Sequence, residues 1–253
     1  MAQPPLSRAI QQLERRLGVV LLHRTTRSIS LTEAGSVLLR EAGLALEAVD
    51  AAERRTRRAA AERPTLVLAA KAGASSQLLS KLLDSYAVEP HASAVQVVLC
   101  GPGQSETMLR DGRADVALLQ LPYDSMAGFD IEELGIERQF AVLPATHPLA
   151  HQADIAMADL HALTDLPLPR WPRPDGTYAE GPGPQVHDHT QLLQLIALGL
   201  ACAVVPESLR PQLREGHAAV SVTDAPTVTT VIAWPPHSRS RAVADLVRAA
   251  SQL

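Results

Sequence analysis

A stretch of 32 residues, from Thr32 to Arg63, contains no proline and only two glycines. Small or apolar residues recur through it at alternating spacings of four and three: Leu38, Ala42, Ala45, Val49, Ala52, Thr56 and Ala59. Such a seven-residue repeat is typical of the seam of a helix that pairs with another helix. A helix of about 29 residues is about 44 Å long, which is too long to be buried inside one small domain. We therefore predict a linker and dimerisation helix over residues 32–63, ended by Pro64, that separates a short N-terminal segment from a longer body.

Charge is distributed unevenly along the chain. The first 63 residues hold 11 arginines and 7 acidic residues, a balance of +4, whereas the remainder carries a balance of −8. The total of −4 alone argues against a nucleic-acid binder, but a basic head on an acidic body is typical of a DNA-binding protein with a second function. A solvated helix without a partner would carry the same charges, so this pattern alone leaves both interpretations open. We attribute the arginines that end the helix to its dipole and to solvation rather than to DNA contact: Arg54, Arg55, Arg57 and Arg58.

Composition narrows the class of protein. Apolar residues make up 46% of the chain and charged residues 20%, as expected of a globular protein. No apolar run reaches the roughly 18 residues of a membrane span, and the N-terminus lacks the pattern of a signal peptide. We therefore expect a cytoplasmic protein without a membrane partner. Cys100 and Cys202 are then expected to be free thiols.

Motifs of catalysis and metal binding are missing from the sequence. It contains no G-x-S-x-G, P-loop, H-E-x-x-H or G-x-G-x-x-G, so we predict neither an enzyme nor a cofactor. His187 and His189 flank Asp188, but on an extended segment the two imidazoles point to opposite faces. Because no third ligand is close in sequence, we predict no metal site.

The N-terminal segment carries a helix pattern followed by a hairpin pattern. Leu6, Ile10, Leu13 and Leu17 form one apolar stripe of a helix that starts near Pro4 and ends at Gly18. The opposite face presents polar groups suited to base edges and phosphates in the major groove. Short apolar runs at 19–22 and 29–31 then flank a basic tip, which predicts a hairpin, or wing, along the DNA backbone. The candidate DNA-binding residues are Gln3, Pro4, Ser7, Arg8, Gln11, Arg24, Thr25, Thr26 and Arg27.

These residues resemble the DNA-binding head of the LysR family of transcriptional regulators. Residues 2–18 are similar to its recognition helix, residues 21–27 to its wing, and Leu31-Thr32-Glu33-Ala34-Gly35 to the start of its linker helix. The resemblance implies a winged helix-turn-helix and a dimerising linker. It departs from the family at the start, because the family's head begins with two further helices, roughly 25 residues that we expect to be absent here. The apolar stripe would then be exposed, covered by a partner chain or badly packed.

The body, residues 64–253, alternates strand and helix patterns. Strands at 66–70, 95–99 and 115–119 alternate with helices at 75–86 and 105–110, which predicts a mostly parallel sheet covered by helices. A second set follows Pro122, with strands at 140–143, 203–205 and 228–234 and helices at 191–198, 206–213 and 239–250. Residues 170–186 are rich in proline and glycine, which indicates an irregular loop.

Three short motifs in the body add to the resemblance. Residues 115–118, 147–150 and 199–206 are similar to the LysR effector-binding domain. That resemblance implies the bilobal α/β fold of periplasmic binding proteins, with lobe one at 65–120 and 228–253, lobe two at 121–227, and a small molecule between them. The expected fold is thus mixed: a partial winged helix-turn-helix (1–31), a linker helix (32–63) and a bilobal effector domain (64–253).

Candidate ligand contacts follow from the rule that α/β sheets bind ligands beyond the carboxyl ends of their strands. Lys71, which we take as a lone cation beside serine hydroxyls, and the free N–H groups of two helix starts favour a small organic anion. Each selected residue could equally be a helix cap or a solvated loop residue. The candidate effector-binding residues are Lys71, Ser75, Ser76, Gly101, Gln120, His187, His189 and Thr190.

The sequence therefore predicts a transcription regulator that binds promoter or operator DNA, senses a small organic anion and forms a homodimer or homotetramer. The first alternative is a paralogue without a complete head that still dimerises. A solute-binding protein of the same bilobal architecture is the second, and the absent signal peptide and the recognition-helix sequence argue against it. An enzyme is the remaining alternative.

Overall fold

The computed structural model describes residues 4–24, 28–60, 65–173, 176–236 and 238–253. The chain divides into two compact units, Met1–Glu53 and Arg54–Leu253. The boundary lies inside one long helix, so the last turns of that helix belong to the second unit.

The first unit consists of two helices and a hairpin. It contains α1 (Pro4–Leu17), β1 (Leu22–Arg24), β2 (Ile29–Leu31) and the greater part of α2 (Glu33–Ala59). β1 and β2 pair antiparallel, with Leu22 opposite Leu31. The predicted helix, hairpin and long helix are therefore confirmed. The Glu14 carboxylate joins α1 to the hairpin, since it accepts hydrogen bonds from the backbone N–H groups of Leu21 and Leu22.

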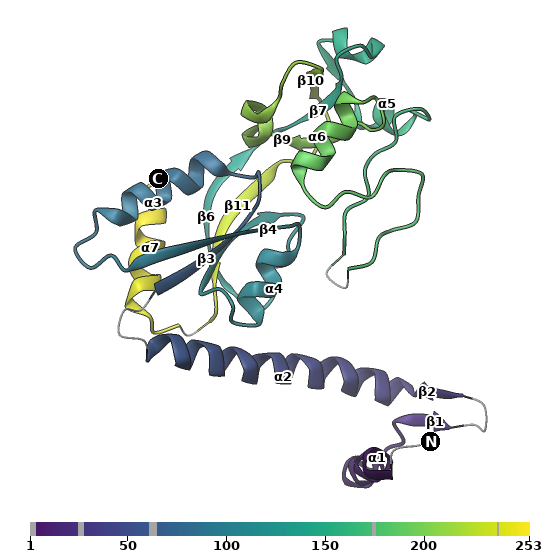
Figure 1. Cartoon of the computed structure of the whole chain (residues 1–253), viewed down its shortest axis with the longest axis vertical. Coiled ribbons are helices and arrows are strands. Elements are labelled where there is room, and N and C mark those ends of the chain that lie inside the picture. Colours follow the sequence, from purple (N-terminus) through teal and green to yellow (C-terminus); the bar gives the residue numbers. More distant parts are fainter. Residues whose placement is uncertain (1–3, 25–27, 61–64, 174–175, 237) are drawn as a thin grey trace. The chain divides into compact units, whose positions relative to one another are not determined.

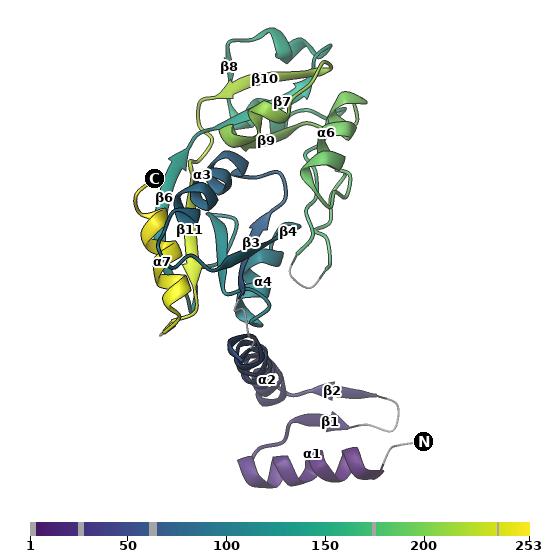
Figure 2. The ribbon, with the colours of Figure 1, turned by 60° about the vertical axis from the view of Figure 1, so that its left-hand side comes forward.

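The hairpin leads directly into α2 (Figure 2), and Thr32 and Gly35 lie at this junction. The Thr32 hydroxyl donates to the carbonyl of Val20 at 2.8 Å and accepts from the N–H of Gly35 at 2.9 Å, which caps the start of the helix. The Thr32 N–H donates to the carbonyl of Leu21. A Cβ on Gly35 would lie 2.1 Å from that same carbonyl oxygen, so only glycine allows this close approach.

The second unit contains two sheets, each covered by helices on both faces (Figure 1). We call the first sheet and its helices lobe one. Parallel pairing joins β3 to β4 and β5, whereas β11 runs antiparallel to β5 and β6. The strand order is β4 (Ala94–Cys100), β3 (Thr65–Lys71), β5 (Val116–Leu121), β11 (Val228–Trp234) and β6 (Asp130–Glu137).

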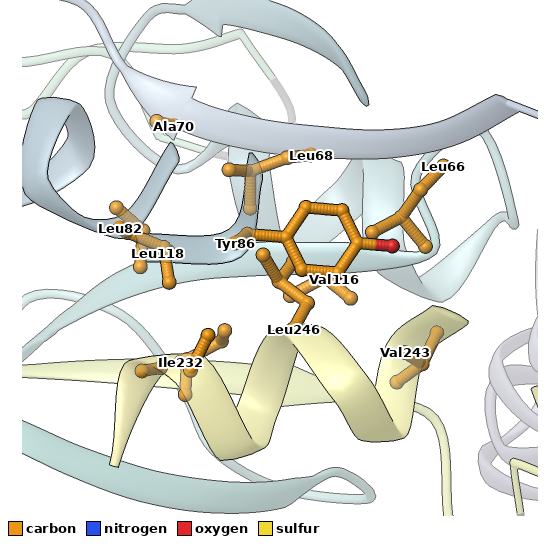
Figure 3. Close-up of a cluster of buried hydrophobic side chains, with 12 residues drawn as sticks. Leu66, Leu68, Ala70, Leu82, Tyr86, Val116, Leu118, Ile232, Val243 and Leu246 are labelled. Carbon is orange, nitrogen blue, oxygen red and sulfur yellow. The ribbon is translucent and has the colours of Figure 1, made fainter. Parts of the chain in front are cut away.

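The core of lobe one has two layers. On one face of the sheet, α3 (Ser76–Ala87) and α7 (Arg241–Ala250) pack over Leu68 and Ile232, with Tyr86 and Leu246 fully enclosed (Figure 3). On the other face, α4 (Gln104–Arg110) packs over the side chains that point the opposite way from the same strands. Strands buried on both faces explain the unbroken apolar runs in the sequence.

Lobe two is built on the second, four-stranded sheet. Its order is β8 (Asp154–Ile155), β10 (His217–Val222), β7 (Gln139–Pro144) and β9 (Ala203–Pro206). α6 (His189–Ala197) covers one face and α5 (Met157–His161) the other. Two short 3-10 helices, η1 (Pro148–His151) and η2 (Glu207–Gln212), complete it.

The structure corrects two sequence-based expectations. Lobe two does not begin at residue 121, because β6 pairs with β11 as the edge strand of the lobe-one sheet. The arginines that end α2 are not merely solvated: Arg54 donates to the carbonyl of Asp111, and Arg58 forms a 2.6 Å ion pair with Asp115. These bonds place the end of α2 with lobe one rather than with a separate linker.

Candidate functional site

Two chain crossings connect the lobes, one from β6 into β7 and one from β10 into β11. Gln139, at the first crossing, accepts a 2.6 Å hydrogen bond from the hydroxyl of Tyr123 and donates one of 2.8 Å to the carbonyl of Pro226 at the second. The Glu137 carboxylate accepts from the N–H of Ser208. Through Gln139 the two crossings are thus joined by a hydrogen bond.

A cavity of about 250 Å³ lies between the lobes, and we call it the interlobe cavity. Lobe one contributes the ends of β3 and β5 and the loop before α4, and lobe two contributes the proline-rich loop, the start of α6 and β9. Its lining is Lys71, Pro102, Gly103, Glu106, Gln120, Tyr123, Asp124, Trp171, Pro172, His189, Val204, Val205 and Pro206.

Lys71 is the cation of this cavity. Its ammonium donates to the side-chain oxygen of Gln120 at 3.0 Å and lies 5.6 Å from the centre of the Tyr123 ring. Burial lowers the pKa of Lys71, and the nearby carboxylate of Asp124 opposes that shift. An ammonium has three N–H groups, so this geometry leaves donors for a ligand oxygen.

Asp124 corrects the expectation that Lys71 is a lone cation. The Asp124 side chain is only 8% exposed, and its carboxylate accepts the backbone N–H of Gln120 at 2.8 Å. Burial raises the pKa of Asp124, whereas Lys71 lowers it. The described lining of the cavity therefore carries the acids Asp124 and Glu106 beside Lys71, and Glu106 forms a 2.7 Å ion pair with Arg110.

His189 connects the lobes at the other side of the cavity. Its Nδ1 lies 3.1 Å from the carbonyl oxygen of Ala72, and its ring packs at 5.3 Å against the indole of Trp171. Because the partner is a carbonyl oxygen, the Nδ1 of His189 is the donor of this bond. Burial is the main cause that lowers the pKa of His189. Gln212 adds a second bridge, from its side-chain amide to the carbonyl of Gly73 at 2.7 Å.

Three of the eight predicted effector contacts line the interlobe cavity: Lys71, Gln120 and His189. Ser75 lies behind the wall, where its hydroxyl meets that of Thr230 and the side-chain amide of Gln120. The other four lie at the rim or on helix starts and are not part of the lining: Ser76, Gly101, His187 and Thr190. The two predicted segments do meet, since a Cβ on Gly73 would lie 3.3 Å from that of His189.

Sequence reasoning missed the aromatic and acidic parts of the lining. Tyr123 and Asp124 follow shortly after β5, at the same edge of the sheet as Gln120. The rule that ligands bind beyond the carboxyl ends of strands would have included them if the segment taken after β5 had been two residues longer. Trp171 is one of only two tryptophans in the chain and stands in the proline-rich loop. A rare aromatic in an irregular loop was the available signal.

The candidate DNA-binding surface lies on α1 and the hairpin. Arg8 and Gln11 are exposed on α1, Ser7 is half-buried, and Arg24 is exposed at the end of β1. Pro4 is the first residue of α1. Gln3, Thr25, Thr26 and Arg27 lie outside the described residues.

The apolar stripe of α1 is partly open. Leu6 and Leu17 are exposed, and Ile10 and Leu13 are half-buried. On α2, the exposed large apolar side chains include Leu39, Leu46 and Val49. Both helices thus present apolar surface within the first unit.

Within the described ranges, no group of histidine, cysteine and acidic residues is arranged to hold a metal ion. Across the same residues, no helix combines the length and apolar character that crossing a membrane requires. Cys100 and Cys202 are free and buried.

The arrangement defines a class of protein: a helix and a hairpin attached to a long helix, followed by a two-lobed α/β body with a cavity between its lobes. Residues 59–253 match the model of the LysR substrate binding domain, and residues 1–36 match that of the bacterial regulatory helix-turn-helix protein, lysR family. The chain therefore belongs to the LysR family of bacterial transcriptional regulators, as its sequence motifs predicted.

Similar proteins carry the names of transcriptional regulators. The chain is 35% identical over 159 residues to the Hca operon transcriptional activator HcaR of Escherichia coli, a match that covers 63% of this chain and 53% of HcaR. It is 28% identical to the HTH-type transcriptional regulator BudR of Raoultella terrigena, over 96% of this chain and 89% of BudR. The chain thus spans about half the length of HcaR and most of BudR.

Solved structures of full-length regulators share the fold. A point mutant of full-length BenM superposes with a TM-score of 0.62 and 25% identity, covering all of this chain and 88% of BenM. CbnR in complex with its target DNA gives a TM-score of 0.57 at 23% identity, over 100% and 90% of the two chains. The predicted mixed fold, a partial winged helix-turn-helix and a long linker helix followed by a bilobal α/β domain, is thereby confirmed.

Proposed function

We propose that this protein is a ligand-responsive transcription regulator that binds operator DNA through α1 and the wing and a small organic anion in the interlobe cavity. The observation that carries the proposal is the joint presence of exposed Arg8, Gln11 and Arg24 on the first unit and Lys71 in a cavity of the second. We propose further that it acts in the cytoplasm as a homodimer or homotetramer and has no enzymatic activity.

The DNA-binding part rests on the chemistry of the exposed side chains. Arg8 and Gln11 lie one turn apart on α1 and have the forked groups that pair with guanine and adenine edges in the major groove. Arg24 stands at the end of β1, next to the wing tip, where a phosphate contact would fix the register of the head on the duplex. Gln3, Thr25, Thr26 and Arg27 remain proposed contacts of the same surface.

The DNA experiment compares specific and non-specific binding. Operator candidates are selected from random duplexes with the full chain, and their affinity is measured over a range of salt concentrations. Arg8→Ala should relax base preference at one position by about 1–3 kcal/mol, whereas Arg24→Ala should weaken all sequences equally and lower the salt slope by about one. Arg40→Ala, an equal charge loss on the exposed side of α2, is the control. No enrichment of any sequence would contradict the DNA-binding role.

The ligand part rests on Lys71 and the walls around it. Tyr123 and Trp171 provide flat apolar surface, and Gln120 and His189 provide orienting polar groups close to the ammonium. A carboxylate on a compact carbon skeleton matches that combination, because one charge-assisted bond fixes one end while the aromatic walls cover the rest. Asp124 opposes the lowering of the Lys71 pKa by burial and so favours the charged ammonium. Ser75, Ser76, Gly101, His187 and Thr190 are proposed as supporting or rim residues.

A thermal-shift screen of small carboxylates tests this part. At least one compound that stabilises the parent protein should bind Lys71→Ala about ten- to a hundredfold more weakly, the loss expected for one charge-assisted hydrogen bond. Lys81→Ala, which removes a lysine from α3 outside the cavity, is the matched control. If every stabilising carboxylate shifted the parent and Lys71→Ala equally, Lys71 would be excluded from the site, and a response to neutral compounds alone would contradict the anion.

A further inference from the structure

A second and larger cavity, of about 600 Å³, lies at the opposite edge of the lobe-one sheet from the interlobe cavity. Thr65 begins β3 there and Asp115 immediately precedes β5, whereas the interlobe cavity lies at the far ends of these strands. Arg55 and Arg58 reach the cavity from the last turns of α2, and Ser240 reaches it from the start of α7. We call it the junction cavity. Its lining shares no residue with that of the interlobe cavity.

The lining of the junction cavity has an excess of positive charge. Among the described residues of the lining, Arg55, Arg58 and Arg239 face a single acid, Asp115, which leaves a surplus of two positive charges. Asp115 is already engaged: one carboxylate oxygen pairs with Arg58 at 2.6 Å, and the other accepts the N–H of Val67 at 3.0 Å. An anion in this cavity would therefore contact an arginine that forms no ion pair with a carboxylate of the described lining.

Two arginine nitrogens in this lining lack partners among the described residues. They are the Nε atoms of Arg55 and Arg58, and both are buried. The Nη2 of Arg55 is held by a 3.3 Å bond to the carbonyl of Leu109. Burial lowers the pKa of Arg55, and Asp115 only partly opposes this. Because buried donors in folded proteins are nearly always paired, these two N–H groups are available to an oxygen that the described residues do not supply, such as one from a bound molecule.

Apolar side chains form the rest of the wall. Leu66, Pro235, Pro236, Ala242 and Val243 contribute most of the surface that faces the cavity, and Ser93 and Ser240 add hydroxyls. The Ser240 hydroxyl caps α7 by accepting from the N–H of Val243. Inorganic ions would leave the apolar wall uncovered, whereas an acid with a carbon skeleton would cover it.

We propose that the junction cavity is a second ligand site, which takes an organic carboxylate with a compact apolar body. The carboxylate binds Arg55 and the Nε of Arg58, and the body packs against Pro235, Pro236 and Val243. The volume lies within the range of known small-molecule pockets, about 300–1,000 Å³.

A ligand in this position would touch the end of α2 and separate segments of lobe one at once. Arg55 and Arg58 belong to α2, Thr65 to β3, and Ser240 to the start of α7. Occupancy would therefore stabilise the attachment of the last turns of α2 to lobe one, independently of any ligand between the lobes.

Calorimetric titration of the full chain tests the site, with cyclohexanecarboxylate and inorganic phosphate as probes. Cyclohexanecarboxylate should bind saturably, more tightly than phosphate, and its binding should persist in Lys71→Ala. Arg55→Gln should weaken it about ten- to a hundredfold. Ala242→Phe, which fills the cavity without changing its charge, should abolish it. Arg40→Gln is the matched control, because it removes the same charge from the same helix outside the cavity.

Unfolding midpoints equal to that of the parent protein show that each variant keeps its fold. The proposal is overturned if neither probe binds saturably at millimolar concentrations, or if Arg55→Gln and Arg40→Gln bind alike. Binding that is lost in Lys71→Ala and kept in Arg55→Gln also overturns it. That last result would place the probe in the interlobe cavity and so leave the proposed function standing.

Discussion

Gly35→Ala tests how the long helix α2 is attached to the hairpin. An added Cβ would lie 2.1 Å from the carbonyl oxygen of Leu21 and 3.0 Å from its carbonyl carbon. Non-bonded heavy atoms prefer separations of about 3.5 Å, so the hairpin backbone would have to move by at least about 1 Å. That carbonyl also accepts the N–H of Thr32, so the movement breaks the hydrogen bonding at the start of α2.

The magnitude follows from two opposing effects. Replacing glycine by alanine inside a helix gains about 1 kcal/mol, whereas overpacking against a neighbour that cannot yield costs about 3 kcal/mol. The net loss of about 2 kcal/mol corresponds to a roughly thirtyfold fall in hydrogen-exchange protection of the β1–β2 and early α2 amides. Gly43→Ala is the control, since no described atom lies within 4 Å of its added Cβ and the same exchange alone should raise protection about fivefold.

Hydrogen exchange followed by mass spectrometry of the full chain measures both variants. Protection in Gly35→Ala equal to or above that of the parent would refute the close contact, because helix propensity would then be the only effect at this position.

Three further outcomes are expected. Val49→Glu places a charge on the exposed apolar face of α2 and should weaken a dimer formed there, as sedimentation measures; a parent protein that is monomeric would contradict the predicted seam. Leu246→Ala, in the closed layer between α7 and the sheet, should lower the free energy of unfolding by about 2–5 kcal/mol in urea titrations, whereas a loss near zero would contradict its full burial. Burial lowers the pKa of His189 in the folded protein, although the hydrogen bond to the Ala72 carbonyl opposes this shift. Below a pH of about 6.5 the unfolded chain therefore binds more protons than the folded chain, and the free energy of unfolding should fall as the pH drops. His189→Gln should flatten this dependence of the urea midpoint, and an equal slope in both proteins would mean that His189 is protonated in the fold.

The sequence predicted the elements whose apolar pattern is strong. The stripe of Leu6, Ile10, Leu13 and Leu17 located α1, and the unbroken apolar runs located β3, β5 and β11. The sequence did not predict β6, because it is an edge strand with little burial. Ile131 and Ile136 are exposed, and acidic residues lie between them. Its pairing with β11 depends on a partner far along the chain, which no local pattern reveals.

The site was predictable in outline and not in detail. The rule that ligands bind beyond the carboxyl ends of strands correctly placed Lys71 and Gln120 at one edge of the sheet, with the start of α6 opposite them. It could not show that Ser75 turns back towards Thr230, or that the turn after β5 carries Asp124 beside Lys71. Side-chain direction at the end of a strand depends on the following turn, which is set by tertiary packing.

The central claim is that an anion in the interlobe cavity changes how the protein binds DNA. Its most direct test is the operator dissociation constant of the full chain, measured with and without a stabilising carboxylate at saturation. We expect a change of about fivefold or more in the parent protein, the lower end of typical allosteric coupling, and none in Lys71→Ala at the same concentration. An operator affinity that the carboxylate leaves unchanged, or that it changes equally in both proteins, would contradict the account.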